Sequence, residues 1–220
     1  MSRSLIILFT LIFSSGHTHA QQAVSGNLLR IEASAGFEGI EFDNGVEDDR
    51  MAGLAVAGSA TYQSSIGLYG HIGYTKNSMS SLRAFDRGIE GINEKEADRT
   101  AGLGFRFSIN DDKGIYLGLG YSKSEIEWEY SSDSFNSAKL FLQKDVKRQY
   151  GTISISHNEG DNLRSISVDG RYIWFFGRSD WGMGLSWTFA EGKYESQPED
   201  LDMSQRAIGV AFMYRPVFDS

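Results

Sequence analysis

The stretch Gly114–Tyr130, GIYLGLGYSKSEIEWEY, contains two different alternating patterns. In its first half every second residue is large and apolar, and the residues between them are mostly glycine or small. The large residues are Ile115, Leu117, Leu119 and Tyr121. A period of two is typical of a β-strand, whose side chains alternate between two faces. After Ser122–Ser124 charged residues appear, and the large apolar residues move to even positions, ending with Trp128 and Tyr130.

The same pattern recurs along most of the chain, in nine segments that we predict to be strands. These are Leu28–Phe42, Met51–Tyr62, Ile66–Lys76, Thr100–Ile109, Ile115–Tyr130, Gln149–His157, Leu163–Phe176, Trp181–Ala190 and Gln205–Tyr214. Each has one apolar face, and in most of them the other face is dominated by glycine, alanine, serine and threonine.

The composition favours many strands and excludes several classes of protein. The 220 residues include 25 glycines, only 2 prolines and no cysteine, so disulfides cannot hold the fold together. Aromatic residues make up 13% of the chain. The net charge of −8 and the absence of a basic run argue against a nucleic-acid-binding protein.

The N-terminal residues MSRSLIILFTLIFSSGHTHAQQ have the pattern of a secretory signal peptide. Arg3 precedes the apolar run Leu5–Phe13, and the small residues Thr18 and Ala20 follow at the positions expected before a cleavage site. The run is much shorter than the ~20 residues of a membrane-spanning helix. We therefore expect cleavage after Ala20 and export of residues 21–220, which must use strands if they cross a membrane.

Two kinds of barrel have strands with one apolar face. A soluble barrel of the lipocalin type turns that face inward and presents polar and charged residues to water. Here the second face consists mainly of small residues, which suit the crowded interior of a small closed barrel. We therefore expect the apolar faces to contact lipid, with aromatic girdles at the strand ends. The girdle candidates are Tyr62, Tyr74, Tyr121, Trp187, Phe189, Phe212 and Tyr214.

The last predicted strand contains a motif that resembles one found in a known protein family. RAIGVAFMY, Arg206–Tyr214, places Gly209, Phe212 and Tyr214 in a pattern similar to the C-terminal signal read by the barrel-assembly machinery. With the export signal and the hairpins, the chain resembles small outer-membrane β-barrel proteins of Gram-negative bacteria, of the porin-like or OmpA/OmpX-type class. That family usually ends at or beside a terminal aromatic residue, whereas this chain continues with RPVFDS.

The resemblance implies an all-β, closed antiparallel up-and-down transmembrane barrel over residues 21–220, located in the cell outer membrane. Its expected partners are outer-membrane lipid, lipopolysaccharide and, during insertion, the assembly machinery.

The number of strands stays open between eight and ten, because single-chain bacterial barrels have even numbers. Either SAKLFLQK, residues 137–144, is a further strand, which gives ten, or Gln149–His157 belongs to a long external hairpin or loop, which gives eight. The short turns at Gln63–Ser65, Asn110–Gly114 and Gly177–Asp180 are predicted to be periplasmic. Three polar segments are predicted to be external loops: Lys76–Asp98, Ser131–Asp145 and Glu191–Asp202. The change of pattern at Ser122–Ser124 then marks either the membrane boundary or a β-bulge.

The predicted lumen face carries few large polar residues. They are Tyr69, His71, Arg106, Tyr116, Asp169 and Arg171. Because unpaired buried charges are costly, we interpret them as a structural network, with a narrow pore or small-ligand site as the alternative. The interior of so small a barrel is largely filled by side chains, which excludes a wide diffusion channel. The expected role is structural or surface interaction, with a narrow porin-like channel as the first alternative.

An outer-membrane lipid-modifying enzyme is the second alternative, because some small barrels are enzymes. Ser156 and His157 are neighbours, so on a strand they point to opposite faces. His157 and Glu159 share a face, but an ordinary polar turn also explains this segment. We expect no catalytic residues and no cofactor. We also expect no metal site, since His17 and His19 lie in the segment expected to be removed, which leaves two histidines.

Overall fold

The protein is described by a computed structural model, which places residues 27–43, 45, 48–81, 95–128, 131–177, 179–196 and 199–218. Nearly all of these residues lie in strands. The strands are β1 (Asn27–Asp43), β2 (Asp48–Gln63), β3 (Leu68–Ser81), β4 (Lys95–Asn110), β5 (Ile115–Trp128), β6 (Ser131–Val146), β7 (Gln149–Gly160), β8 (Leu163–Phe175), β9 (Trp181–Ser196), β10 (Glu199–Tyr214) and β11 (Val217–Phe218). The placed residues contain no helix that is long and apolar enough to cross a membrane.

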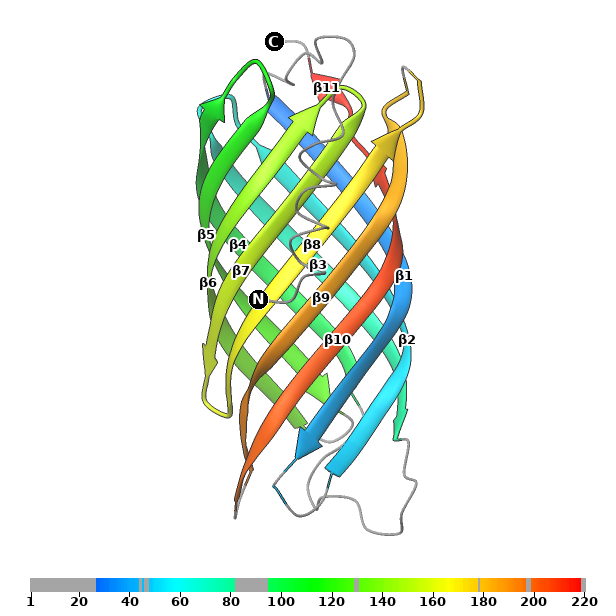
Figure 1. Ribbon diagram of the computed structural model, residues 1–220, viewed down its shortest axis with the longest axis vertical. Coiled ribbons are helices and arrows are strands. Elements are labelled where there is room, and N and C mark those ends of the chain that lie inside the picture. Colours follow the sequence, from blue (N-terminus) through cyan, green and yellow to red (C-terminus); the bar gives the residue numbers. More distant parts are fainter. Residues whose placement is uncertain are drawn as a thin grey trace.

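Strands β1 to β10 form a closed antiparallel up-and-down barrel (Figure 1). Each strand pairs with the next one in the chain, and β10 returns to pair with β1 from Ile31↔Tyr214 to Asp43↔Asp202. The two-residue β11 extends the wall beside the start of β1. The prediction of a closed barrel is confirmed with ten strands, and the eight-stranded alternative is wrong. The tenth strand is β6, which contains residues 137–144.

The two rims differ in their connections. Short turns link β2–β3, β4–β5, β6–β7 and β8–β9 at the end that carries β11, drawn at the top of Figure 1. Three of these turns use glycine with a positive φ, at Gly67, Gly114 and Gly177, where other residues would be strained. At Gly114 a Cβ atom would also lie only 2.3 Å from the carbonyl oxygen of Asp145. Because its short turns are the ones predicted to be periplasmic, we call this rim the periplasmic rim and the opposite one the external rim.

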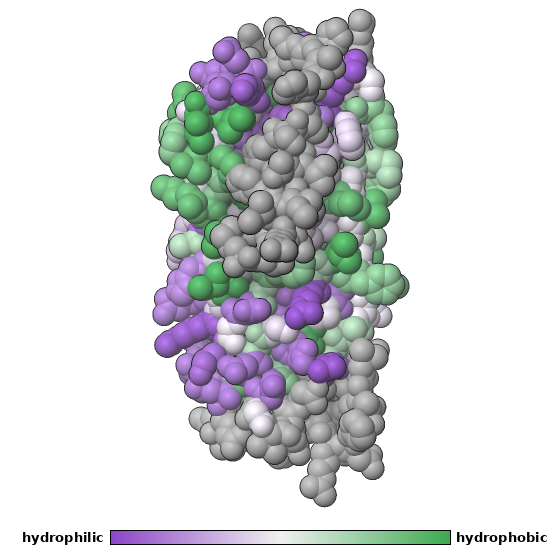
Figure 2. Space-filling view, viewed as in Figure 1, coloured by the Kyte–Doolittle hydropathy of each residue, from purple (hydrophilic) through white to green (hydrophobic). Residues whose placement is uncertain are grey.

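A belt of exposed apolar side chains surrounds the part of the barrel next to the periplasmic rim. It includes Phe37, Leu54, Ile72, Leu103, Leu119, Ile155, Leu185 and Ile208. On the face shown in Figure 2 the hydrophobic surface lies in the upper half, and hydrophilic side chains form a band below it. Such an exposed apolar surface is stable in contact with lipid but not with water. The belt therefore marks the membrane-spanning part of each strand.

β5 shows what happens at the change of pattern in its sequence. Its pairing with β6 runs without interruption from Ile115↔Lys144 to Trp128↔Ser131, so no bulge lies between Ser122 and Ser124. Even-numbered residues face the lumen along the whole strand, and Trp128 is buried there. The strand keeps its orientation while its surroundings change. The outer face leaves lipid and becomes polar, and the inner face becomes apolar.

The polar segments predicted to be external loops are largely strands. Ser131–Asp145 lies within β6, and Glu191–Asp202 forms much of the β9–β10 hairpin. The ends of Lys76–Asp98 belong to β3 and β4, and residues 82–94 lie outside the placed residues. Several strands of 14–17 residues are thus longer than the ~9–11 residues that cross a bilayer. The barrel wall therefore continues beyond the membrane on the external side.

Candidate functional site: the barrel lumen

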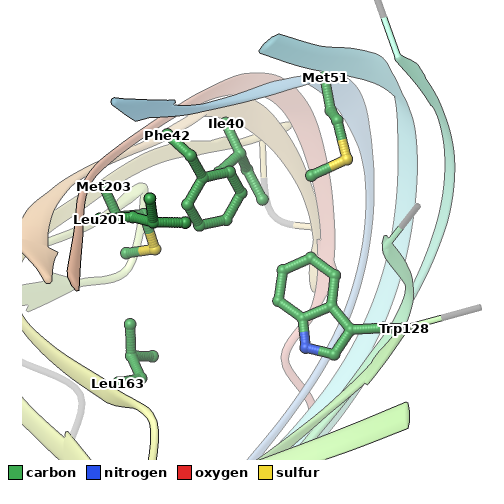
Figure 3. Close-up of a cluster of buried hydrophobic side chains, with 7 residues drawn as sticks. All are labelled: Ile40, Phe42, Met51, Trp128, Leu163, Leu201 and Met203. Atoms are coloured by element: carbon green, nitrogen blue, oxygen red, sulfur yellow. The ribbon is translucent and has the colours of Figure 1, made fainter. Parts of the chain in front are cut away.

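The external end of the lumen is filled by an apolar cluster, which we call the external plug. It consists of Ile40, Phe42, Met51, Trp128, Leu163, Leu201 and Met203, which come from β1, β2, β5, β8 and β10 (Figure 3). Phe42 and Leu201 are each only 1% exposed. The plug lies beyond the lipid belt, so here the barrel buries its apolar side chains inward, as a water-soluble barrel does.

Hydrogen bonds to one carboxylate hold the aromatic part of this plug. The Asp133 carboxylate accepts hydrogen bonds from Trp128 Nε1 at 2.8 Å and from the Tyr194 hydroxyl at 2.7 Å. Asn162 Nδ2 donates to its other oxygen at 2.6 Å. Phe42 packs edge-on against Tyr194, with ring centroids 5.6 Å apart. Burial and the neighbouring Asp133 carboxylate raise the pKa of Tyr194, which therefore stays a neutral donor.

A buried ionic cluster lies next to the plug, also beyond the belt. Lys95 Nζ lies 2.6 Å from Glu38 Oε1 and 2.7 Å from Asp98 Oδ2, and Gln205 Nε2 donates to Glu38 at 2.7 Å. Burial alone would lower the pKa of Lys95, but the charges of Asp98 and Glu38 outweigh it and raise that pKa. Burial raises the pKa of Asp98 despite the attraction of Lys95. The two carboxylates therefore favour the charged form of Lys95.

Two polar cavities occupy the middle of the lumen. The one toward the periplasm has a volume of about 430 Å³, and the external one about 370 Å³. They share lining residues, among them His71, Lys139 and Arg171, so they adjoin each other. The external cavity has a wall of hydroxyl and amide groups. There Asn158 accepts a hydrogen bond from Ser137 at 2.6 Å and donates to Ser165 at 3.0 Å.

The six polar residues predicted for the lumen face all belong to inward-pointing positions, but they do not form one site. Tyr69 stacks beside His71, with ring centroids 6.4 Å apart. Arg106 lies 3.7 Å above the ring of Tyr116. Asp169 accepts hydrogen bonds from Thr188 at 3.0 Å and from Ser154 at 3.4 Å. The partner of the sixth residue, Arg171, is Glu32, at 2.7 Å. The predicted residues thus divide into small groups with separate partners.

The periplasmic end of the lumen contains a second closure, which we call the arginine cluster. Its centre is Asp145, which is 0% exposed. Arg30 pairs with one carboxylate oxygen, and Arg215 Nη1 lies 2.5 Å from the other. Arg106 Nη1 approaches at 3.8 Å, and Gln143 Nε2 donates at 3.2 Å. The guanidinium groups also stack on aromatic rings, Arg30 on Tyr150 and Arg215 on Phe175.

Most of the arginine cluster was missed by the sequence analysis. Asp145 was assigned to the end of an external loop, whereas it lies at the periplasmic end of β6. Arg215 follows the last predicted strand, and nothing in the sequence indicates that it turns inward. Arg30 could have been found, because it shares the inward parity of Leu28 and Glu32 on β1. Pairings between strands far apart in the chain bring these residues together.

The candidate enzyme residues do not form a catalytic arrangement with each other. His157 lies on β7 on the outward face, and Ser156 is buried toward the lumen, as the alternation predicts. The segment 155–160 continues β7 and is not a turn, which corrects that interpretation. Among the placed residues no group of three or more His, Cys, Asp or Glu side chains could hold a metal ion.

The C-terminal motif lies in the closing strand of the barrel. Phe212 is 50% exposed on the outer face of β10, and Tyr214 packs against Trp181 with ring centroids 4.7 Å apart. Gly209 lies opposite Gly36 of β1, where a Cβ atom would be 2.7 Å from the Ala35 carbonyl oxygen. A larger residue at this position would push β1 and β10 apart, so Gly209 contributes to the seam as well as to the motif.

The closed ten-stranded barrel and its lipid-facing belt define the chain as a transmembrane β-barrel of the outer-membrane class. No protein-family model matches the sequence, and no curated protein matches it significantly.

Several solved structures resemble the barrel. The outer-membrane protease OmpT of Escherichia coli has 8% identity and a TM-score of 0.45, over 91% of this chain and 99% of that one. The translocator domain of the autotransporter NalP from Neisseria meningitidis has 12% identity and a TM-score of 0.46, over 96% and 95%. The attachment invasion locus protein Ail of Yersinia pestis has 6% identity and a TM-score of 0.31, over 84% and 99%. Likeness at this level carries no information about activity.

Proposed function

We propose that this protein is a non-conducting outer-membrane barrel with a structural or surface-interaction role. The observation that carries the proposal is the filling of the lumen at two levels, by the external plug and by the arginine cluster. Each level consists of buried side chains whose removal from their partners would cost several kcal/mol. A lumen crossed twice in this way does not support a permanently open pore.

The part of the wall beyond the membrane supports the surface role. Its outer face carries exposed charged side chains in place of the lipid belt, among them Glu41, Arg50, Arg99 and Glu125. Arg99 pairs with Glu127 at 2.7 Å across β4 and β5. This external cylinder is a rigid, hydrogen-bonded surface that extends from the membrane, and such surfaces present contacts to other molecules without ordering a loop.

The proposed location is the cell outer membrane, reached by export and cleavage after Ala20. The proposed surroundings are outer-membrane lipid and lipopolysaccharide, with insertion by the assembly machinery through the motif of Gly209, Phe212 and Tyr214. The exposed aromatic side chains Tyr62 and Tyr121 fit the interfacial girdle of such a membrane.

Conductance in planar lipid bilayers tests the proposal directly. The folded full-length protein, verified by a mobility change on gels with and without boiling, is expected to insert without stepwise current. The double variant Phe42→Ala, Trp128→Ala removes much of the external plug but leaves the arginine cluster, so it is also expected to stay silent. Stepwise conductance of the unmodified protein would overturn the proposal.

A narrow channel is the second candidate, and one observation favours it. The two polar cavities share lining residues, so a continuous polar path occupies the middle of the lumen. Conduction would then require both closures to open. Under this alternative, current through the unmodified protein should change when Arg171, whose side chain is 34% exposed in the lumen, is replaced by glutamine.

A further inference from the structure

The arginine cluster contains more positive than negative charge. Three guanidinium groups, those of Arg30, Arg106 and Arg215, lie within 4 Å of the Asp145 carboxylate. Among the placed residues, Asp145 is the only carboxylate that pairs with any of the three. All four side chains are at least nine-tenths buried. One negative charge therefore faces three positive charges in a place that water reaches poorly, which is unfavourable without a further anion.

The same region has buried donors without acceptors. Arg30 Nε, Gln63 Nε2 and Arg106 Nη1 have no hydrogen-bond partner among the placed residues. Gln63 is 1% exposed, and its amide is oriented by Arg30, whose Nη1 and Nη2 donate to the Gln63 oxygen at 3.1 and 3.2 Å. The Gln63 oxygen is thus used as an acceptor, and its NH₂ group is the part without a hydrogen-bond partner among the placed residues. With Arg215 Nε, which also has no partner among the placed residues, four unused donors in one buried cluster indicate a missing acceptor.

Two of the residues that carry these buried donors lie beside a cavity. Arg30 and Gln63 both line the 430 Å³ cavity, together with the aromatic side chains of Tyr69 and Tyr150. This volume is large compared with a water molecule's share of the liquid, about 30 Å³. A small ligand therefore has room beside Arg30 and Gln63, and a shift of these side chains, with the strands of the wall in place, would bring the buried donors to it.

We propose that the periplasmic floor of this cavity binds a small oxyanion, such as inorganic phosphate or a small carboxylate. Guanidinium groups present their donors in a planar fork that matches the spacing of two oxygens on such an anion. Arg30 and Gln63 line the cavity and supply a charged and a neutral donor, and Arg106, which lies behind them beside Asp145, adds positive charge. The site is separate from the question of conductance, because it needs only a ligand that reaches the lumen.

Calorimetric titration of the folded full-length protein in detergent with inorganic phosphate tests the proposal. Ionic strength is held constant with sodium chloride, so that general screening does not change. We expect saturable heat for one phosphate per chain, and at least about tenfold weaker binding for Arg106→Gln, which removes a positive charge next to the site. Arg99→Gln is the matched control, because Arg99 lies on the outer face of the barrel, where it pairs with Glu127, and it should bind like the unmodified protein. Equal isotherms for all three proteins, or no saturable heat, would overturn the proposal.

A second variant keeps the test decisive even where Arg106→Gln folds poorly. Gln63→Glu places a carboxylate beside Arg30, where the proposed anion would supply its charge. The variant is expected to fold, to resist urea better than the unmodified protein, and to lose phosphate binding. Lower resistance to urea in Gln63→Glu would show that the positive charge is already compensated, and would overturn the proposal.

Discussion

Asp145 is the residue on which the periplasmic closure depends. Its carboxylate is the common partner of three arginines that come from β1, β4 and the chain after β10. Most contact between β6 and these other parts of the wall runs through this side chain, and Arg215 Nη1 also donates to the Val146 carbonyl oxygen at 3.2 Å. Because the arginines are buried, they cannot exchange Asp145 for water without moving.

Replacement of Asp145 by asparagine is expected to destabilise the barrel by about 3–5 kcal/mol, because it leaves buried positive charges without a counter-ion. The measurement is the urea dependence of unfolding in lipid vesicles. The control is Asp169→Asn, since Asp169 is a third exposed and its lysine partner is 4.0 Å away. The control should cost about 1 kcal/mol or less. Similar losses in the two variants would contradict the special role of Asp145.

Lys95 makes stability depend on pH at the alkaline end. Its pKa is raised above the ordinary value of 10.5 in the folded protein by Asp98 and Glu38. Its contribution is therefore complete below pH 10.5 and is lost as the pH rises through the folded-state pKa. We expect the difference in unfolding free energy between the unmodified protein and Lys95→Met to be large at pH 8 and to shrink above pH 10.5. Lys193→Met, at an exposed lysine on β9, should give a small difference at both pH values. A difference for Lys95→Met that does not change with pH would contradict this account.

At the scale of the element, β5 shows how the outer face of one strand can contact lipid along one part and water along the next. Up to Tyr121 its outward side chains face lipid, and its inward residues after Tyr116 are small. Beyond that point the outward residues Lys123 and Glu125 face water, and Trp128 fills the lumen. The strand needs no bulge for this, because only the sequence pattern changes while the backbone pairing continues.

The same charged substitution should therefore have different effects on either side of this boundary. Leu119→Arg, on the lipid-facing side of β5, is expected to cost about 2–4 kcal/mol, the cost of an arginine near the middle of the bilayer. Ser132→Arg, at an exposed position of β6 opposite Glu127, should stay within about 0.5 kcal/mol. Urea unfolding in vesicles measures both. If the two substitutions cost the same, the boundary assigned to β5 is in the wrong place.

Alternation in the sequence is sufficient to predict the membrane-spanning parts of the strands, because lipid requires an apolar outer face at every second residue. It does not predict β6 reliably. In β6 the run Leu140–Leu142 has three apolar residues in succession, and one of them, Phe141, points inward over Gly118. The external halves of β9 and β10 were taken for loops because their outer faces meet water. In that region a polar strand and a polar loop have the same composition.

The composition of the lumen was predicted better than its contacts. Parity alone places Arg106 and Arg171 inside, but their partners Asp145 and Glu32 come from distant strands. Such pairs depend on the stagger of the whole barrel, which no local pattern specifies. The external plug could have been found from the even-numbered Ile126 and Trp128, if a water-facing outer wall had been considered there.

For the whole molecule, the wall that extends beyond the belt predicts which surface reaches the medium. The chain has no cysteine, so single cysteines can be introduced without side reactions. Glu195→Cys, on the external β9–β10 hairpin, should react with a membrane-impermeant maleimide in intact cells. Lys113→Cys, in the β4–β5 turn, should react only after the outer membrane is permeabilised. Labelling of Lys113→Cys alone in intact cells would reverse the assigned orientation.

The pairing of β1 with β10 has a consequence for the folding and insertion of the barrel. β1 is synthesised before the other strands of the barrel and β10 after them, so one edge of β1 stays uncovered until β10 has been made. Until then both edges present unpaired amide and carbonyl groups, which are costly in lipid and prone to join other chains. A chain shortened by its final strand should therefore be recovered in aggregates or degraded, and not as a nine-stranded intermediate. Closure makes insertion of this barrel an all-or-none event, which requires β10, the last strand of the barrel to be synthesised.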